Sequence, residues 1–257
     1  MNLYAAGNTS FPLITAHTGC MGTLDNTLES VRRGIELGAD VIEEDIRVTQ
    51  DGVAVLAHDD LWTGAGGGQI RISQTRYAEL RKLEVVAHHA GKKGSMSFST
   101  LEDLLRIIRS SGRMANLDLK TDEAVEAAAE LVRRLDMFDQ VFLSGCEAER
   151  ARLAESRQPK LNKLLNADAK LFMAVAYDQA VKQTCQDALA ASCFGINIYH
   201  EFITPALVEQ AEVSGLAVYA WTVNEPVLME LYADMGVASI TARNVEALVQ
   251  LKLKRSP

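Results

Sequence analysis

Four charged side chains and one amide stand at spacings that could assemble a catalytic site. Glu43 and Asp45 lie two residues apart in an apolar stretch that is typical of a β-strand. Asn116, Asp118 and Lys120 follow the same spacing in a second such stretch. Because successive side chains of a strand alternate sides, the members of each set share one face. If both faces line the same interior, the three acidic residues form a cluster of carboxylates.

Such a cluster calls for a positive counter-charge. Ionised carboxylates crowded in a partly dry site cost several kcal/mol each unless a cation offsets them. Lys120 supplies only one positive charge, which is too little for three carboxylates. A hard divalent cation that prefers oxygen ligands, Mg²⁺ or Ca²⁺, is the natural choice. The pattern therefore predicts a metal site. The alternative is a set of salt bridges among the strands, with Glu44 solvated at a strand edge.

Two histidines stand at the ends of predicted strands. His17 closes the segment LITAH, and His58 closes VAVLAH. In a barrel of parallel strands the catalytic groups come from the C-terminal strand ends, and an imidazole that titrates near neutral pH can accept or donate a proton. Two histidines beside a cation suit cleavage of a phosphoester, whereas a single histidine at a strand end is more often structural.

The elements that would position these residues alternate along the chain. Short apolar segments rich in β-branched residues precede longer segments of helical period, which is the pattern of a parallel sheet covered by helices. About eight strands favour a closed (β/α)8 TIM barrel. A doubly wound open sheet is the alternative, but no GxGxxG follows the first strand. The predicted strands are residues 13–17, 41–48, 53–58, 115–120, 140–145, 161–167, 194–200, 216–223 and 238–242.

The second strand region is followed by the least regular part of the sequence. Residues 41–48 and 53–58 are separated by a short turn, so they form either a hairpin or one strand that continues into a second. Residues 61–99, approximately, are predicted to be a small insertion between barrel elements, a size at which loops are usually functional lids or additions. No linker divides the chain, so residues 1–257 are expected to form a single domain.

The charge balance limits the class of ligand. The net charge of −8 and the isoelectric point near 5.2 argue against a nucleic-acid partner, because phosphate backbones are bound by clustered Lys and Arg. One small phosphorylated ligand in a locally positive pocket remains compatible with this charge. We therefore expect a small-molecule partner.

Cysteine usage and hydropathy indicate the compartment. The cysteines form neither a CxxC pair nor a dense framework, so reduced thiols are expected. The N-terminal segment lacks the basic and apolar regions of a signal peptide, and no apolar run approaches the ~20 residues that span a bilayer. We expect a cytoplasmic protein without stable membrane insertion, and the oligomeric state is not predicted. The cysteines are Cys20, Cys146, Cys185 and Cys193.

These residues belong to a larger set of motifs that resembles one family. In their order, and over nearly the whole chain, they resemble the glycerophosphodiester phosphodiesterase family. The block GADVIEEDIRVTQDG followed closely by HD is the most specific part. The motifs are HTG (17–19), DNT (25–27), GADVIEEDIRVTQDG (38–52), HDDL (58–61), TLEDLL (100–105), NLDLK (116–120) and AWTVNE (220–225).

The resemblance implies a TIM barrel that binds its substrate at the C-terminal mouth and carries an insertion after the second strand region. It also implies metal-dependent cleavage of glycerophosphodiesters to sn-glycerol 3-phosphate and an alcohol. The roles it implies are general acid and base for His17 and His58, binding of Mg²⁺ or Ca²⁺ for Glu43, Asp45 and Asp118, and substrate binding for Lys120, Trp221 and Thr18.

Several positions depart from the usual pattern of the family. Thr18 stands where an arginine usually binds phosphate, and threonine has no charged guanidinium that could form two hydrogen bonds to a phosphate. Asp25 and Asp118 are each one methylene shorter than the usual glutamate. Ala242 stands where an aspartate is usual. Spider-venom sphingomyelinase D enzymes, which share the barrel and its two histidines, also have aspartate in the DxK motif, so Asp118 is an acceptable ligand. Phosphate binding is nevertheless expected to be weaker than is usual in the family.

The departures leave other readings of function open. The same chemistry could serve a sugar phosphodiester or a lysophospholipid headgroup. A barrel that binds phosphodiesters without turning them over is a third possibility, supported by Thr18 and Ala242 and opposed by the intact histidines. Either water or a neighbouring hydroxyl of the substrate could attack the phosphorus, and the second route gives a cyclic phosphate.

Overall fold

Eight parallel strands form a ring in the computed structural model, which describes residues 11–89 and 92–255. In order around the ring the strands are β1 (Leu13–Ala16), β2 (Val41–Val48), β8 (Met114–Leu119), β9 (Val141–Ser144), β10 (Asn162–Asn166), β11 (Gly195–Tyr199), β12 (Ala217–Trp221) and β13 (Ser239–Ala242). β1 pairs with both β2 and β13, so the ring is closed. The predicted TIM barrel is confirmed, and the open-sheet alternative is wrong.

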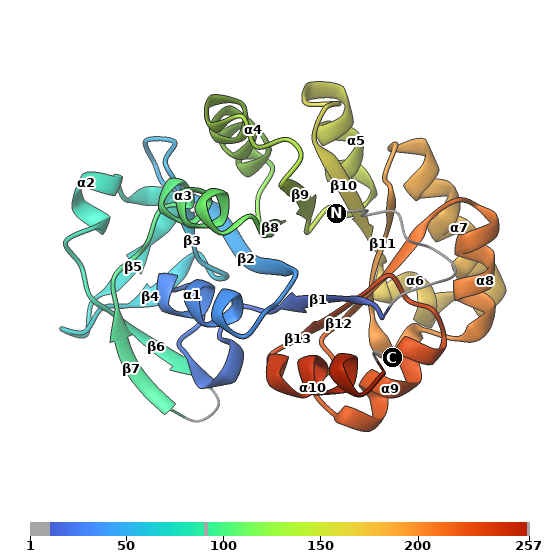
Figure 1. Cartoon of the computed structure of the whole chain (residues 1–257). Coiled ribbons are helices and arrows are strands. Elements are labelled where there is room, and N and C mark those ends of the chain that lie inside the picture. Colours follow the sequence, from blue (N-terminus) through green and yellow to red (C-terminus); the bar gives the residue numbers. More distant parts are fainter. Residues whose placement is uncertain (1–10, 90–91, 256–257) are drawn as a thin grey trace.

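The helices begin where the sequence supplies caps. Thr27, Thr100 and Thr204 each accept a hydrogen bond from a backbone N–H of the following first turn, which satisfies a donor that the helix itself cannot pair. The helices lie outside the ring of strands (Figure 1). They are α1 (Leu28–Glu36), α3 (Leu101–Ser111), α4 (Glu123–Leu135), α5 (Ala148–Arg157), α6 (Ala169–Ala174), α7 (Tyr177–Ala190), α8 (Pro205–Val213), α9 (Pro226–Asp234) and α10 (Val245–Arg255), with short 3₁₀ turns η1 (Cys20–Gly22) and η3 (His200–Phe202).

A hairpin follows the second barrel strand. β3 (Ala54–Leu56) runs antiparallel to β2, so the hairpin interpretation is correct and the alternative of one continuing strand is wrong. Beyond β3, the backbone N–H of Ala57 donates to the carbonyl of Asp45 at 3.0 Å. The hairpin therefore returns the chain along β2, and brings His58 close to Asp45.

The segment predicted as an insertion builds small sheets beside the barrel (Figure 1). Its apolar side chains form a separate cluster that includes Ile72, Leu80 and Val85, and the rings of Trp62 and Phe98 meet edge to face at 5.3 Å. The single-domain organisation of the whole chain stays a prediction. The elements of the insertion are β4 (Leu61–Thr63), β5 (Gln69–Arg71), η2 (Ile72–Gln74), α2 (Tyr77–Leu80), β6 (Val85–His89) and β7 (Lys92–Met96).

The interior of the barrel is apolar at one end and polar at the other. Phe142, Phe194 and Tyr219 pack edge to face with ring centroids 5.6 to 5.7 Å apart, and they fill the end at which the strands begin. This packing closes the barrel floor to water. Polar side chains such as Glu43 and Asn197 line the interior farther along the strands, so the fold leaves the C-terminal mouth for the site.

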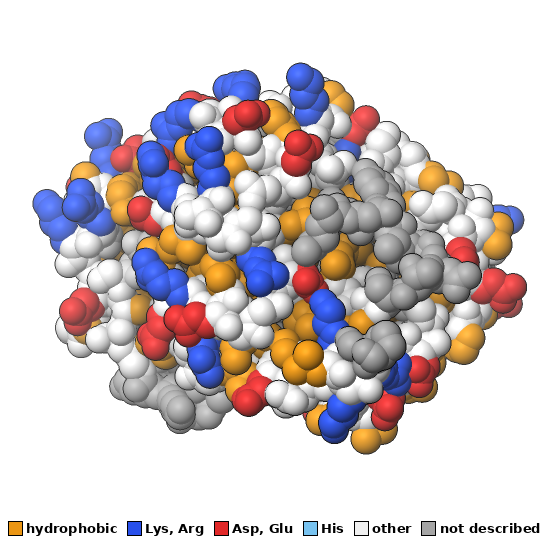
Figure 2. All heavy atoms as spheres, in the orientation of Figure 1, with side chains coloured by type: hydrophobic (Ala, Val, Ile, Leu, Met, Phe, Trp, Pro, Cys, Tyr) orange, Lys and Arg blue, Asp and Glu red, His pale blue; other side chains and the backbone are white. Residues whose placement is uncertain are grey.

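Glu43, Asp45 and Asp118 line the cavity at this mouth. Among the residues that the structure describes, the outer surface has no comparable cluster on the face that Figure 2 shows. On that face acidic and basic side chains are interspersed. Within the described chain, a group of acidic residues close enough to share a metal ion lies on the middle of β2 and near the end of β8. Among the described helices, none combines the length and the apolar character needed to cross a membrane.

Candidate active site

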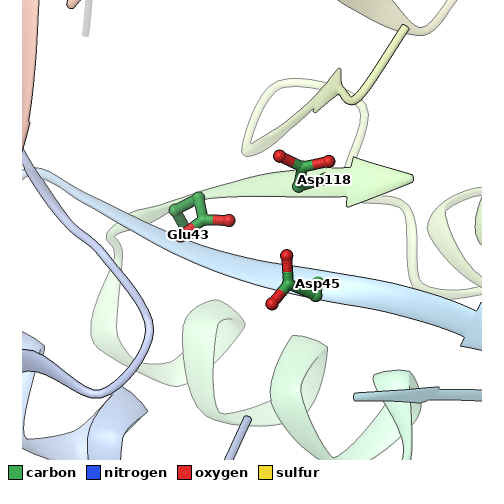
Figure 3. A group of neighbouring side chains, drawn as sticks. All are labelled: Glu43, Asp45 and Asp118. Carbon is green, nitrogen blue, oxygen red and sulfur yellow. The ribbon is translucent and has the colours of Figure 1, made fainter. Parts of the chain in front are cut away.

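The three predicted metal ligands converge inside the barrel. Asp45 of β2 stands directly opposite Asp118 of β8 in the strand register, and Glu43 stands opposite Asn116. One carboxylate oxygen from each acidic residue lies within 4.8 Å of the others. Figure 3 shows the three carboxylates facing one another from the two strands. The alternation of side chains along each strand thus produces the cluster, as the sequence predicted.

Burial makes this cluster electrostatically costly. Burial raises the pKa of Glu43 well above its ordinary value, and the charges of Asp45 and Asp118 raise it further. Burial also raises the pKa of Asp118. Three carboxylates crowded inside the barrel need a positive counter-charge, and a compact set of oxygen donors suits the hard ions Mg²⁺ and Ca²⁺. The residues present therefore fit the divalent cation that the sequence implies.

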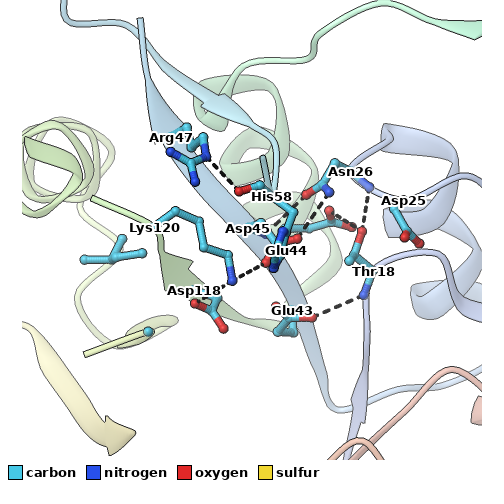
Figure 4. Close-up of polar contacts among 12 residues, drawn as sticks. Thr18, Asp25, Asn26, Glu43, Glu44, Asp45, Arg47, His58, Asp118 and Lys120 are labelled. Atoms are coloured by element: carbon cyan, nitrogen blue, oxygen red, sulfur yellow. Dashed lines mark hydrogen bonds and ion pairs between the residues drawn. The ribbon is translucent and has the colours of Figure 1, made fainter. Parts of the chain in front are cut away.

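Lys120 is the nearest positive charge to the cluster. Its Nζ lies 2.8 Å from Asp45 Oδ1 and 3.1 Å from Asp118 Oδ1, as the dashed lines in Figure 4 mark. Burial alone would lower the pKa of Lys120, but the two carboxylates outweigh burial and raise it. Lys120 is therefore charged, and it balances only one of the three carboxylates.

Both predicted catalytic histidines reach the cavity that holds the cluster. This cavity of about 650 Å³ is lined by His17, His58 and the three carboxylates. His17 Nδ1 lies 2.8 Å from the carbonyl oxygen of Thr18; because a carbonyl only accepts, Nδ1 carries the hydrogen and Nε2 is the basic atom of the neutral ring. Burial, followed by the positive charge of Arg243, lowers the pKa of His17.

The second histidine has a different environment. The side chain of His58 is 64% exposed, and its Nδ1 lies 2.9 Å from Asp59 Oδ1. The carbonyl of His58 accepts a hydrogen bond from Arg47 Nε at 2.7 Å, which fixes the backbone at the cavity rim (Figure 4). Because an ionised carboxylate only accepts a hydrogen bond, Nδ1 of His58 carries a hydrogen, and Nε2 is the ring nitrogen that can exchange a proton.

Of the predicted substrate contacts, Thr18 has the least expected environment. Its hydroxyl donates to Glu44 Oε2 at 2.7 Å and accepts from the backbone N–H of Asn26 at 2.6 Å. Its backbone N–H donates to Glu43 Oε2 at 3.2 Å. Thr18 lines the cavity, but its hydroxyl fastens β2 to the loop before α1 (Figure 4). A role in substrate binding stays a prediction.

Trp221 also lines the cavity, at the end of β12. Its ring lies 5.5 Å from that of Tyr199, between centroids. Its indole Nε1 is buried and meets no hydrogen-bond acceptor among the residues that the structure describes. An apolar ring with an unused donor suits a ligand that carries oxygen atoms.

Glu44 corrects one alternative that the sequence left open. It is not solvated at a strand edge, because its exposed fraction is 0%. It points away from the other carboxylates, toward the side covered by α1, where Thr18 donates to one oxygen and the other oxygen has no partner within the described chain. Burial, which outweighs the Thr18 hydrogen bond, raises the pKa of Glu44 well above its ordinary value.

Because Glu44 is buried and its pKa is raised, we expect the free energy of unfolding to depend on pH. Above the ordinary carboxyl pKa the unfolded chain has lost a proton that folded Glu44 retains, so stability falls as the pH rises toward the raised pKa. Glu44→Gln imitates the protonated side chain and should remove this loss. We expect the variant to exceed the wild type by about 1–3 kcal/mol in free energy of unfolding at pH 8, the cost of an unsatisfied buried polar group, and to match it near pH 4.5.

Urea denaturation in EDTA at several pH values measures this difference. Glu36→Gln is a matched control, because Glu36 is an exposed carboxylate at the end of α1. A difference between wild type and Glu44→Gln that stays constant with pH would contradict the assignment.

Two arginines in the cavity were missed by the sequence analysis. Arg243 follows β13 and forms a two-point ion pair with Asp25, with Nη1–Oδ1 and Nη2–Oδ2 distances of 2.5 and 3.2 Å. Arg150 of α5 donates through Nη1 to the carbonyls of Leu119 and Gly145. Only the position of Arg243, one residue beyond the last strand of a closed barrel, could have indicated its place beside His17.

Comparisons with known proteins agree with this geometry. A family model described as "Glycerophosphoryl diester phosphodiesterase family" matches residues 8–247. A glycerophosphodiester phosphodiesterase of Caldanaerobacter subterraneus subsp. tengcongensis is 23% identical over 248 residues, which cover 94% of this chain and 98% of that protein.

Solved structures share the fold. The phosphodiesterase of Oleispira antarctica in complex with the product sn-glycerol-3-phosphate superposes with a TM-score of 0.78 at 22% identity, covering 95% of this chain and 97% of that one. The glycerophosphodiester phosphodiesterase of Agrobacterium tumefaciens gives a TM-score of 0.75 at 21% identity, covering 93% and 99%.

Proposed function

Since the chain belongs to the glycerophosphoryl diester phosphodiesterase family and is a phosphoric diester hydrolase, we propose that it cleaves glycerophosphodiesters to sn-glycerol 3-phosphate and an alcohol with the help of a divalent cation. One observation carries the proposal. Two buried carboxylates, one partly buried carboxylate and two histidines, from distant parts of the chain, line a single cavity at the barrel mouth. A small-molecule substrate suits a cavity of about 650 Å³.

The cation would be held by Glu43, Asp45 and Asp118. A divalent cation bound there supplies Lewis-acid stabilisation of the charge that develops on the phosphoryl group. Lys120 holds Asp45 and Asp118 in place and adds a positive charge near the same position. Mg²⁺ and Ca²⁺ both accept carboxylate ligands.

The two histidines would move the protons. His17, whose lowered pKa keeps its ring neutral near pH 7, is suited to take the proton of the attacking hydroxyl. His58, beside Asp59, is suited to give a proton to the leaving alcohol. As the bond from the attacking oxygen to phosphorus forms and the bond to the alcohol oxygen breaks, one proton enters and one leaves the pair.

Arg243 is the residue that we expect to bind the phosphate on the side of His17. Its guanidinium is presented in the cavity by the ion pair with Asp25. Arg243→Gln should lower kcat/KM by about 10- to 100-fold, mainly through KM, because a hydrogen bond to a charged group is worth about 1.5–3 kcal/mol. Steady-state kinetics and inhibition by sn-glycerol 3-phosphate measure the effect.

Arg32→Gln, a change on the outer surface of α1, is the control. The double variant Asp25→Asn with Arg243→Gln also removes the half-buried carboxylate that faces Arg243. If both the KM and the inhibition constant of the product stay at the wild-type values in the Arg243 variants, the phosphate role is wrong.

A substrate panel tests the proposed function. Purified protein with Mg²⁺ or Ca²⁺ is incubated with glycerophosphocholine, glycerophosphoethanolamine, a lysophospholipid and a sugar phosphodiester, and the released alcohol and sn-glycerol 3-phosphate are measured. Turnover of the glycerophosphodiesters supports the proposal. Turnover of only the lysophospholipid or the sugar diester would move the activity to that substrate class. The cytoplasmic location of the protein stays a prediction.

A further inference from the structure

A buried asparagine on the floor of the candidate metal site has no use in the mechanism above. Asn116 of β8 is 3% exposed and lines the same cavity as the carboxylates. It stands opposite Glu43 in the strand register and lies two residues before Asp118, on the same interior face. Its amide oxygen Oδ1 is inaccessible and accepts no hydrogen bond within the described part of the chain.

Among the asparagines that line the cavity, Asn116 alone has a buried oxygen without a partner in the described chain. Two further asparagines line the cavity, Asn166 of β10 and Asn197 of β11. Asn166 Oδ1 accepts from the backbone N–H of Gly145 at 2.9 Å and from Asn197 Nδ2 at 3.3 Å. Asn116 alone of the three keeps a buried acceptor without a donor, and it is the one beside the carboxylates. Buried polar atoms without partners are rare, and a bound ion or water is a common reason.

We propose that Oδ1 of Asn116 is a fourth protein ligand of the divalent cation held by Glu43, Asp45 and Asp118. This inference rests on the proposed cation site. A neutral carbonyl oxygen is a suitable additional donor, because Mg²⁺ and Ca²⁺ accept Asn oxygens and a neutral ligand adds no repulsion to a cluster that already carries three carboxylates. The ligand set would then be three carboxylates and one amide, from two adjacent strands.

Cation binding without substrate tests this assignment. Asn116→Leu keeps the approximate shape and removes the oxygen, whereas Asn116→Asp keeps an oxygen and adds a negative charge. Titration calorimetry with Mg²⁺ and with Ca²⁺ should show about a 10-fold or larger loss of affinity in Asn116→Leu and an unchanged or higher affinity in Asn116→Asp. Asn197→Leu, in the same cavity but on β11, should bind the cation as the wild type does.

The two variants of Asn116 separate coordination from packing. Wild-type affinity in Asn116→Leu would overturn the proposal, and so would an equal loss in both variants, which would indicate that the amide nitrogen or the shape of the side chain matters. Thermal melts in EDTA verify that the variants fold, and if the leucine variant does not fold, Asn116→Ala replaces it. If the wild type binds no cation, both the cation site and this inference are wrong. If it binds the cation but does not cleave glycerophosphodiesters, only the proposed reaction is wrong.

Discussion

Replacing either His17 or His58 with alanine lowers kcat by about 10²- to 10⁴-fold, the usual contribution of general acid–base catalysis. Both rings line the cavity that holds the carboxylates, so each can reach a bound phosphodiester. The double variant loses little more than the worse single variant, because groups that act as a unit are not additive. Initial rates with a glycerophosphodiester measure these losses.

The histidine variants should remain folded. His58 is largely exposed. The contacts of the His17 ring with the Thr18 carbonyl and, at 3.8 Å, with Glu43 are a small part of the interactions of the barrel. His200→Ala is the control, since His200 contacts Tyr232 away from the cavity lining, and it should keep wild-type activity. Near-normal turnover in either His17→Ala or His58→Ala would remove that histidine from the mechanism.

Removing the divalent cation has the second large effect. Dialysis against EDTA should lower activity by more than about 10³-fold, because Lewis-acid stabilisation is worth several kcal/mol of barrier. Added Mg²⁺ or Ca²⁺ should restore the rate. Glu43→Gln and Asp118→Asn should each weaken cation binding and remain inactive at cation concentrations that saturate the wild type.

The same carboxylate variants should have the opposite effect on stability. Without a cation, the ionised cluster opposes folding, because burial and mutual repulsion raise the pKa of Glu43 and Asp118. These raised values mean that the cation-free protein loses stability as the pH rises and that protons compete with the cation as the pH falls. In EDTA at pH 8, Asp118→Asn should therefore melt at or above the temperature of the wild type. With Mg²⁺ the order should reverse.

Melting curves with and without cation, at pH 5.5 and pH 8, test this reversal. Mg²⁺ should raise the melting temperature of the wild type more at pH 8 than at pH 5.5. Asp122→Asn is a matched control, because Asp122 lies at the cavity rim, exposed and paired with Arg150. Full activity after exhaustive removal of divalent ions, or equal cation effects on wild type and Asp118→Asn, would contradict the metal role of the cluster.

Much of this site could be predicted from the sequence because strand geometry is simple. Glu43 with Asp45, and Asp118 with Lys120, must each share a face, and a closed barrel turns such faces inward. His17 ends a predicted strand of the barrel, and parallel strands bring such ends to one rim. His58 also ends a predicted strand, but it reaches the site because the antiparallel hairpin returns the chain to Asp45. The charge of the cluster then indicated the kind of ion. These inferences need only local spacing and the closure of the barrel.

The rest depends on contacts that local spacing does not encode. Whether Glu44 is solvated depends on what covers the outer face of β2, and its partner Thr18 lies 26 residues earlier in the chain. Arg243 meets Asp25 across 218 residues, a pairing that exists only because the last strand closes against the first. The unpaired oxygen of Asn116 is likewise visible only once the hydrogen bonds of the other asparagines are known.

Phosphorus NMR of the wild-type protein with glycerophosphocholine, in Mg²⁺, in Ca²⁺ and in EDTA, tests the central claim most directly. We predict that the diester resonance is replaced by that of a phosphomonoester, or first by that of a cyclic phosphate, only when a cation is present. The identity of the first product also shows whether water or a glycerol hydroxyl attacks. An unchanged diester resonance in every condition, with a cation bound in titration calorimetry, would contradict the account and indicate a barrel that binds phosphodiesters without cleaving them.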